Sequence, residues 1–127
     1  MRRIVMVMAL VALLVTVFAS VALARNFQCS ERPCFGTSQD DVILERGGQG
    51  VADTIYGRAG RDVIKAHHFS DDFDKLLGGP GGDRLNSNDG DSRDVVRGGP
   101  GVDTCIVDRN DATFSCEHLI IDGVRIR

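Results

Sequence analysis

The sequence predicts an all-β fold, a right-handed parallel β-roll (a β-solenoid) of about three to four coils with short disulfide-stapled terminal caps. One observation is a ladder of aspartates separated alternately by long steps of 11 or 12 residues and short steps of 9. The ladder comprises Asp41, Asp53, Asp62, Asp74, Asp83, Asp94 and Asp103. A second observation is that the residue two places after each aspartate is apolar or cysteine. One coil takes about 20 residues, so each coil contains two aspartates.

Four glycine-led segments predict tight turns along one side of the roll. Residues 36–44, 57–65, 78–86 and 98–106 align without gaps, with glycine first, aspartate sixth and an apolar residue or cysteine eighth. Glycine permits positive φ at a turn where a side chain would clash. The intervening turns are two or three residues longer, so they predict a second row of wider turns on the opposite side.

The residues after each aspartate predict very short strands with one inward side chain each. The expected inward set is Ile43, Ile55, Ile64, Leu76, Leu85, Val96 and Cys105. Period-two alternation leaves the flanking residues Lys65, Lys75, Arg84 and Arg97 in water. One Gly-Asp turn alone does not indicate a solenoid, because such turns are common in proteins. Seven aspartates in one ladder, in a chain that is 43% hydrophobic, indicate a packed solenoid rather than disorder.

Residues 1–24 predict a secretory signal peptide. Residues 1–3 are basic at two positions, residues 4–18 are almost wholly apolar, and Ala22-Leu23-Ala24 offers a small-residue cleavage site. A transmembrane anchor is the alternative, because the apolar stretch nearly reaches the ~20 residues that span a bilayer. The Ala-x-Ala end and the polar residues after it favour cleavage, and hence a secreted, extracellular protein without a stable membrane anchor.

The charge balance after cleavage suits cations as ligands. Cleavage after Ala24 leaves 103 residues, enough for one small domain. Its 13 basic and 18 acidic residues give a net charge of −5. An acidic balance argues against nucleic acid as the partner.

The four cysteines predict two disulfides. Cys29, Cys34, Cys105 and Cys116 form an even set in a short exported chain. Three pairings are possible, and the sequence-local one, Cys29–Cys34 with Cys105–Cys116, is preferred because it places one staple at each end. A zinc site would need tighter CxxC-type spacing, which this sequence does not have.

The glycine-led segments resemble a known repeat. Gly78-Gly-Pro-Gly-Gly-Asp-Arg-Leu-Asn86 is similar to the G-G-x-G-x-D-x-U-x repeat of the RTX, or haemolysin-type, calcium-binding family, in which U is a large apolar residue. Residues 98–106 match as well, with Cys105 in the apolar slot; residues 57–65 lack the second glycine; residues 36–44 keep only the first glycine and the aspartate. The resemblance covers about residues 36–106 and implies a parallel β-roll with calcium between stacked turns.

The resemblance also implies the ligands. They are the backbone carbonyls at repeat positions two and four and the carboxylate at position six. Along this chain these positions are Thr37, Gln39 and Asp41; Arg58, Gly60 and Asp62; Gly79, Gly81 and Asp83; and Gly99, Gly101 and Asp103. An oxygen-only set suits a hard cation such as calcium. Each ion lies between two adjacent turns, and the pair 78–83 and 98–103 matches the repeat best.

The long turns depart from the family. Asp53, Asp74 and Asp94 are candidate metal ligands there, although the family's geometry does not carry over to longer turns. The turns leading to the last two also contain Asp71, Asp72, Asp89 and Asp91. Irregular calcium sites and solvated acidic loops both remain open interpretations.

The segments outside the repeats are expected to cover the open ends of the solenoid. Residues 25–35 would form an N-terminal cap, residues 36–106 the calcium-binding roll, and residues 107–127 a C-terminal cap. Within the last segment, residues 118–126 predict a hairpin around Asp122-Gly123.

The sequence therefore predicts a calcium-ion-binding protein in which Ca²⁺ relieves carboxylate repulsion and promotes folding. Two alternatives remain open: a secreted adhesion or interaction scaffold with purely structural calcium, and a roll that has lost calcium. Exposed aromatic residues would favour the scaffold, and the candidates are Tyr56, Phe69 and Phe73. The three histidines accompany no nucleophile or zinc-protease motif, so no enzymatic activity is expected.

Overall fold

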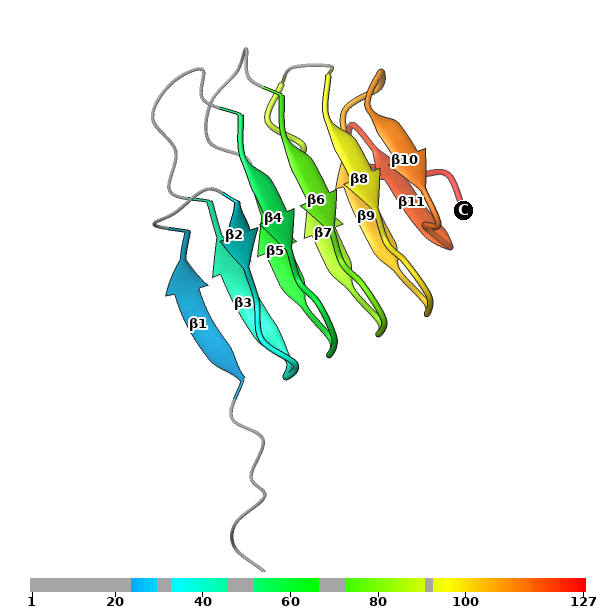
Figure 1. Ribbon diagram of the computed structural model, residues 1–127. Coiled ribbons are helices and arrows are strands. Elements are labelled where there is room, and N and C mark those ends of the chain that lie inside the picture. The colour runs from blue at the N-terminus through cyan, green and yellow to red at the C-terminus, as the bar shows by residue number, and fades with distance from the viewer. Residues whose placement is uncertain (1–23, 30–32, 46–51, 67–72, 91–92) are drawn as a thin grey trace, which may run out of the picture.

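A computed structural model describes residues 24–29, 33–45, 52–66, 73–90 and 93–127, and within them it contains strands and no helix (Figure 1). The signal peptide predicted over residues 1–24 lies almost wholly outside this part. The strands are β1 (Arg25–Gln28), β2 (Cys34–Phe35), β3 (Asp41–Leu44), β4 (Thr54–Tyr56), β5 (Val63–Lys65), β6 (Lys75–Leu77), β7 (Arg84–Asn86), β8 (Val95–Arg97), β9 (Thr104–Val107), β10 (Ala112–Phe114), β11 (His118–Ile121) and β12 (Val124–Arg125). The described residues form no helix that is long and apolar enough to cross a membrane.

The strands form two sheets on opposite sides of a solenoid of about four turns, which confirms the predicted fold class. One sheet has the order β1-β3-β5-β7-β9-β11-β12, and the other has the order β2-β4-β6-β8-β10. Every pairing is parallel except β11 with β12. The chain passes from the five-stranded to the seven-stranded sheet through the tight turns and returns through the long ones, so the two kinds of turn line opposite edges.

The core consists of two facing columns of inward side chains, one on each sheet. All seven predicted inward residues are fully buried, at 0% exposure: Ile43, Ile55, Ile64, Leu76, Leu85, Val96 and Cys105. Strand register stacks each one on its neighbour one coil away, for example Ile64 on Leu85. The predicted flanking side chains Lys65, Lys75, Arg84 and Arg97 are exposed. Burying aliphatic side chains stabilises the roll by roughly 1.5–3 kcal/mol each.

The two sheets extend into both segments expected to act as caps. At the N-terminal end, β1 pairs with β3 and β2 with β4. At the C-terminal end, β10 pairs with β8 and β11 with β9, and only β12 reverses direction in a hairpin. The hairpin turn is Asp122-Gly123, and both residues have positive φ, as a two-residue type I′ turn requires.

Both disulfides have the sequence-local pairing. Cys29 is bonded to Cys34, and Cys105 to Cys116. The second bond joins the inward slot of β9 to the segment between β10 and β11. Each end of the roll is therefore held by one covalent link.

Arg58 occupies repeat position two, where the repeat has glycine, and its backbone has a φ of 79°. The left-handed region costs a side-chain-bearing residue about 1–2 kcal/mol. The Arg58 guanidinium lies 5.0 Å from the centre of the Phe35 ring, a contact that offsets part of this cost. Both substitutions at Arg58 remove the ring contact, and only glycine also removes the backbone strain. We therefore expect Arg58→Gly to be more stable than Arg58→Ala by about 1 kcal/mol in urea denaturation. Equal stabilities would show that this turn is unstrained.

Candidate metal centre

The aspartates of the tight turns form a continuous hydrogen-bonded ladder. The amide of Asp41 donates to Oδ1 of Asp62, at 2.8 Å, and Asp62 and Asp83 donate in the same way to the carboxylates of Asp83 and Asp103, each at 2.8 Å. All four side chains are at most 2% exposed. The position of each carboxylate is fixed because every coil supplies one acceptor and one donor at the same register.

The second oxygen of these carboxylates has no hydrogen-bond partner. Oδ2 of Asp62, Asp83 and Asp103 is buried and accepts no hydrogen bond. In each case it faces the first glycine of its own turn so closely that a Cβ there would overlap it, as at Gly78 against Asp83. A buried, unsatisfied anionic oxygen is costly unless a cation neutralises it.

The carbonyls at repeat positions two and four face the next turn. A Cβ on Gly79 would overlap the carbonyl oxygen of Arg58, and one on Gly81 would overlap that of Gly60. The same relation joins Gly99 to Gly79 and Gly101 to Gly81. The predicted carbonyl ligands therefore line the gaps between turns, on the edge of the roll that carries the aspartate ladder.

The first turn differs from the other three. The Thr37 amide donates to Oδ2 of Asp41 at 2.6 Å, and its hydroxyl contacts both carboxylate oxygens, at 3.1 and 2.9 Å. Asp41 is therefore satisfied within its own turn. Of the four carboxylates predicted in the tight turns, Asp62, Asp83 and Asp103 keep a buried oxygen without a hydrogen bond and Asp41 does not.

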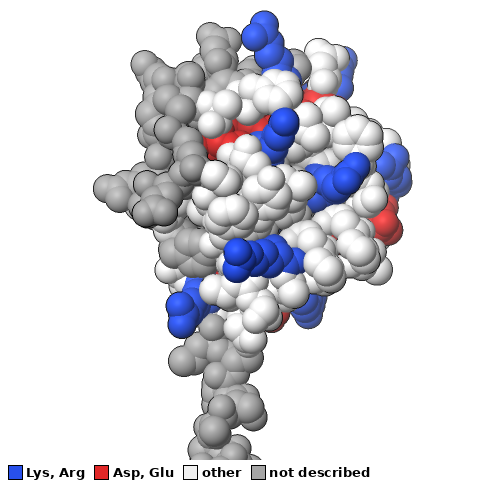
Figure 2. All heavy atoms as spheres, viewed as in Figure 1, with Lys and Arg blue, Asp and Glu red and all other residues white. Residues whose placement is uncertain are grey.

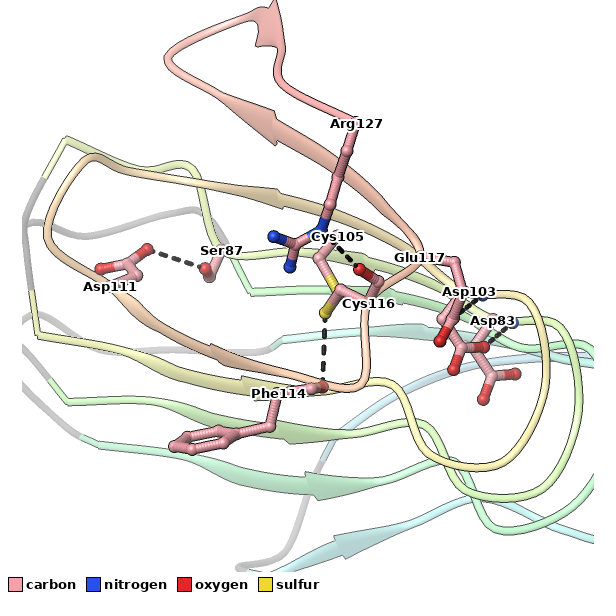
Figure 3. Close-up of a disulfide and its surroundings, with 9 residues drawn as sticks. All are labelled: Asp83, Ser87, Asp103, Cys105, Asp111, Phe114, Cys116, Glu117 and Arg127. Atoms are coloured by element: carbon pink, nitrogen blue, oxygen red, sulfur yellow. Dashed lines mark hydrogen bonds between the residues drawn. A yellow bond between two sulfur atoms is a disulfide. The ribbon is translucent and has the colours of Figure 1, made fainter.

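Glu117 completes the ladder at the C-terminal end. Its Oε2 accepts the Asp103 amide at 2.9 Å, in the place that the aspartate of a further coil would take. Figure 3 shows the carboxylates of Asp83, Asp103 and Glu117 side by side at the turn edge, beside the Cys105–Cys116 disulfide. Sequence reasoning missed Glu117. It follows Asp103 by 14 residues instead of 20 or 21 and has no glycine-led segment before it.

Burial makes the ladder carboxylates hard to ionise. Desolvation raises the pKa of Asp62 to about 6, from 3.8, and the neighbouring Asp41 carboxylate adds to the rise, while the hydrogen bond from the Asp41 amide opposes it. Desolvation likewise raises the pKa of Asp83 to about 6, with contributions from Asp62 and Asp103. The pKa of Asp103 is raised for the same reason. On the face shown in Figure 2, acidic side chains appear as a few small groups among basic and uncharged ones.

The raised pKa values predict an unusual pH dependence for the calcium-free protein. Between pH 3.8 and about 6, the folded state binds more protons at Asp62 and Asp83 than the unfolded state does. Stability from these groups is therefore greatest below pH 3.8 and is lost as pH rises through about 6. We expect metal-stripped protein to resist urea better at about pH 4.5 than at about pH 7.5. Higher stability at the upper pH would contradict this prediction.

The aspartates of the long turns form a parallel ladder. The Asp53 amide donates to Oδ1 of Asp74 at 2.7 Å, and Asp74 donates to Asp94 at 2.8 Å. Asp94 in turn donates to Oδ1 of Asp111 at 3.2 Å. Asp111, which sequence reasoning missed, follows Asp94 by 17 residues and so falls short of the repeat spacing. Its other oxygen accepts the Ser87 hydroxyl and the Asp108 amide, so Asp111 closes the ladder (Figure 3).

Three carboxylates of the long-turn edge converge. One oxygen from each of Asp74, Asp89 and Asp94 lies within 4.8 Å of the other two, which makes the cluster a second candidate metal centre. Asp108 positions Asp89, because its Oδ2 accepts the amides of Asp89 and Gly90, both at 2.9 Å. The other acidic residues predicted in these turns, Asp71, Asp72 and Asp91, lie outside the described residues.

The donor set at both edges consists of oxygen atoms. At the tight turns it combines buried carboxylate oxygens with inward-facing carbonyls, and these are the ligands that Ca²⁺ prefers. The described residues that face the gaps contribute no sulfur or imidazole nitrogen, which softer metals favour. The site therefore fits a hard cation.

Comparison with protein-family models agrees with this chemistry. The RTX calcium-binding nonapeptide repeat matches in four copies, over residues 47–67 and 77–111. No curated protein and no solved structure matches the chain. The match leaves out residues 36–46, the segment in which Thr37 satisfies Asp41, and includes the turns that keep unsatisfied carboxylate oxygens. The coils over residues 47–67 and 77–111 are RTX calcium-binding nonapeptide repeats.

Proposed function

We propose that this chain is a secreted calcium-ion-binding protein, in which Ca²⁺ held between stacked glycine and aspartate turns promotes folding. The observation that carries the proposal is the row of buried, unpartnered Oδ2 atoms on Asp62, Asp83 and Asp103. A bound divalent cation would supply the positive charge that this row lacks. Calcium suits an exported protein, because extracellular sites with a Kd of up to ~10⁻³ M are still occupied.

The proposed ligands come from three consecutive turns. The carbonyls of Arg58, Gly60, Gly79, Gly81, Gly99 and Gly101 would act with the carboxylates of Asp62, Asp83 and Asp103. The gaps between the second, third and fourth turns are the two principal sites. We assign lower affinity to the gap next to Asp41, because Thr37 already satisfies that carboxylate.

The proposed link to folding is electrostatic. Without a cation, successive aspartates of the stack repel one another across the gap between coils, and this repulsion adds to desolvation, the main cause, in raising the pKa values of Asp62 and Asp83. The unfolded chain holds no such stack, so the binding free energy of calcium becomes folding free energy. The protein's role is then binding and structural, with no catalytic step.

Calcium titration tests the proposal. Oxidised protein from residue 25 onward, stripped of metal, is titrated with CaCl₂ by calorimetry and followed by far-UV circular dichroism. We expect heat of binding for at least two ions, a gain of β signal and a higher melting temperature. MgCl₂ is the matched control and should leave all three unchanged, because Mg²⁺ demands a small octahedral site. A stripped protein that is already fully folded and gives no heat with calcium would overturn the proposal.

A second candidate function, an interaction scaffold, is favoured by an outward row on the five-stranded sheet. Strand register aligns Phe35, Tyr56, Leu77, Arg97 and Phe114 across all five strands. Phe35 and Phe114 are each 48% exposed, and the Phe35 and Tyr56 rings stack at 5.1 Å. If this row binds a cell-wall polymer, Phe35→Ser with Phe114→Ser should abolish co-sedimentation with that polymer and leave the calcium response unchanged. Unchanged co-sedimentation would remove this candidate.

A further inference from the structure

The outward face of the seven-stranded sheet has a pocket near its C-terminal end. Its volume is about 240 Å³, and it is lined by Arg84, Thr104, His118, Ile120 and Arg125. Strand register places Arg84 of β7, Thr104 of β9 and His118 of β11 in one row across the sheet. Arg125 of β12 pairs with Ile120 of β11 and closes the pocket from the edge. The pocket therefore lies on a sheet face and borders the tight-turn edge, because Arg84, Thr104 and His118 begin their strands.

No side-chain carboxylate of the described residues pairs with the two arginines of this pocket. Neither Arg84 nor Arg125 forms an ion pair within the described part of the chain, where the recorded pair is Arg109 with Asp122. No described carboxylate lines the pocket. Acidic residues directly precede three of the lining residues, and all three belong to the ladder at the turn edge: Asp83 accepts the Asp62 amide, Asp103 the Asp83 amide and Glu117 the Asp103 amide. Two guanidinium groups thus line one concave surface, and the recorded contacts of Arg125 are with the Arg127 main-chain oxygen, 3.5 Å from Nε, and with His118.

The hydrogen-bonding groups of the pocket are donors. Arg125 Nη2 lies 3.3 Å from His118 Nδ1, and because a guanidinium can only donate, Nδ1 must be the acceptor. A neutral His118 ring then carries its hydrogen on Nε2, which adds a further donor. The Thr104 hydroxyl can also donate. Two cations and two neutral donors around one space are the complement of an oxyanion.

The pocket is also held in place by the fold. Leu119, between His118 and Ile120, is buried and pairs with Cys105, which the disulfide links to Cys116. The Arg127 side chain donates from Nε to the Cys116 carbonyl at 3.0 Å and fastens the end of the hairpin (Figure 3). Preorganised donors lower the entropic cost of binding a ligand.

We propose that this pocket binds a sulfate or phosphate group, free or carried as the monoester of a small molecule. The two guanidinium groups would hold the oxyanion from opposite sides above Thr104. Ile120 gives the pocket an apolar wall against which the carbon portion of an ester would pack. This site shares no residue with the proposed calcium sites, although the amides of three lining residues donate to the carbonyls of Asp62, Asp83 and Asp103.

A sulfate titration tests the pocket, and sulfate is preferred to phosphate because calcium phosphate precipitates. Calcium-loaded protein is titrated with sodium sulfate at low ionic strength and followed by ¹H–¹⁵N NMR of the His118 ring and the arginine Nε groups. We expect saturable shifts at His118 and Arg125, and affinity at least fivefold weaker in Arg84→Gln and in Arg125→Gln, on the order of one charged hydrogen bond lost. Arg97→Gln is the control, since Arg97 is an exposed cation on the other sheet.

The outcomes separate the sources of the oxyanion. Tighter binding of glucose 6-sulfate than of inorganic sulfate, with glucose itself inert, would assign an ester, and the reverse order would assign the free anion. Shifts that do not saturate, or an equal loss of affinity in Arg97→Gln, would overturn the proposal. The His118 shifts in the unaltered protein keep the test decisive even if a variant folds poorly. Calcium binding measured in parallel shows separately whether the roll is intact.

Discussion

Gly81→Ala is expected to destabilise the calcium-loaded protein by about 3 kcal/mol or more, from the sum of a backbone and a packing penalty. Gly81 has a φ of 151°, and a Cβ there would overlap the carbonyl oxygen of Gly60 in the preceding turn. Because that atom belongs to the backbone of a stacked coil, it cannot move aside without separating two turns. A domain of this size would melt lower by roughly 10–20 °C.

Gly82→Ala is the matched control for this change. A Cβ on Gly82 would lie 3.3 Å from the Val102 carbonyl oxygen and 3.8 Å from Arg61 Nε, and its backbone is outside the left-handed region. We expect this variant to melt within about 3 °C of the unaltered protein. Melting curves of the two variants in saturating calcium make the comparison. Equal losses would show that the turn tolerates no side chain anywhere, and equal tolerance would show that the coils are not tightly stacked.

Asp83→Asn is expected to stabilise the calcium-free protein and to weaken its response to calcium. The asparagine carbonyl can still accept the Asp62 amide, now 2.8 Å from Oδ1 of Asp83, so the ladder stays connected. Removing the charge also removes the repulsion between Asp83 and both Asp62 and Asp103. At about pH 7.5 we expect the stripped variant to melt higher by about 5 °C. In calcium the order should reverse, because one proposed ligand is neutral.

The reversal distinguishes a ligand from a merely buried acid. Calorimetry should show at least one bound ion fewer for Asp83→Asn than for the unaltered protein. The variant should have the higher melting temperature without calcium and the lower one with calcium. Asp40→Asn is the control, because Asp40 is exposed on the same edge and accepts the Arg61 amide. It removes the same charge without removing a buried oxygen. A variant that binds calcium as the unaltered protein does would exclude Asp83 from the site.

The sequence predicted the repeating part of this protein because its signals are local and periodic. Each aspartate lies next to its own turn and two residues from its own core side chain, so one spacing rule places both. Ile43 and Leu85, two coils apart on the seven-stranded sheet, therefore lie in the same column, with Ile64 between them.

The ends of the roll followed no such rule. β1 and β2 join the sheets without a ladder aspartate or a glycine-led segment of their own. Glu117 and Asp111 take ladder positions in shorter coils, and this is visible only once the strands are stacked. The sequence also did not predict the hydrogen bond from Thr37 to the Asp41 carboxylate, because that bond depends on the conformation of the local turn and not on residue spacing.

Cys105 connects the roll to redox chemistry. It fills the slot where the other coils place a branched aliphatic residue, so the last layer of the core is closed by a covalent bond instead of by packing alone. A thiol at this position is smaller than leucine or valine and leaves the end of the column underfilled until Cys116 joins it. Under the proposed function, completion of the structure depends on an oxidant as well as on a cation. We therefore expect the chain to stay incompletely folded where the medium is reducing and poor in calcium, and to fold fully where both are supplied.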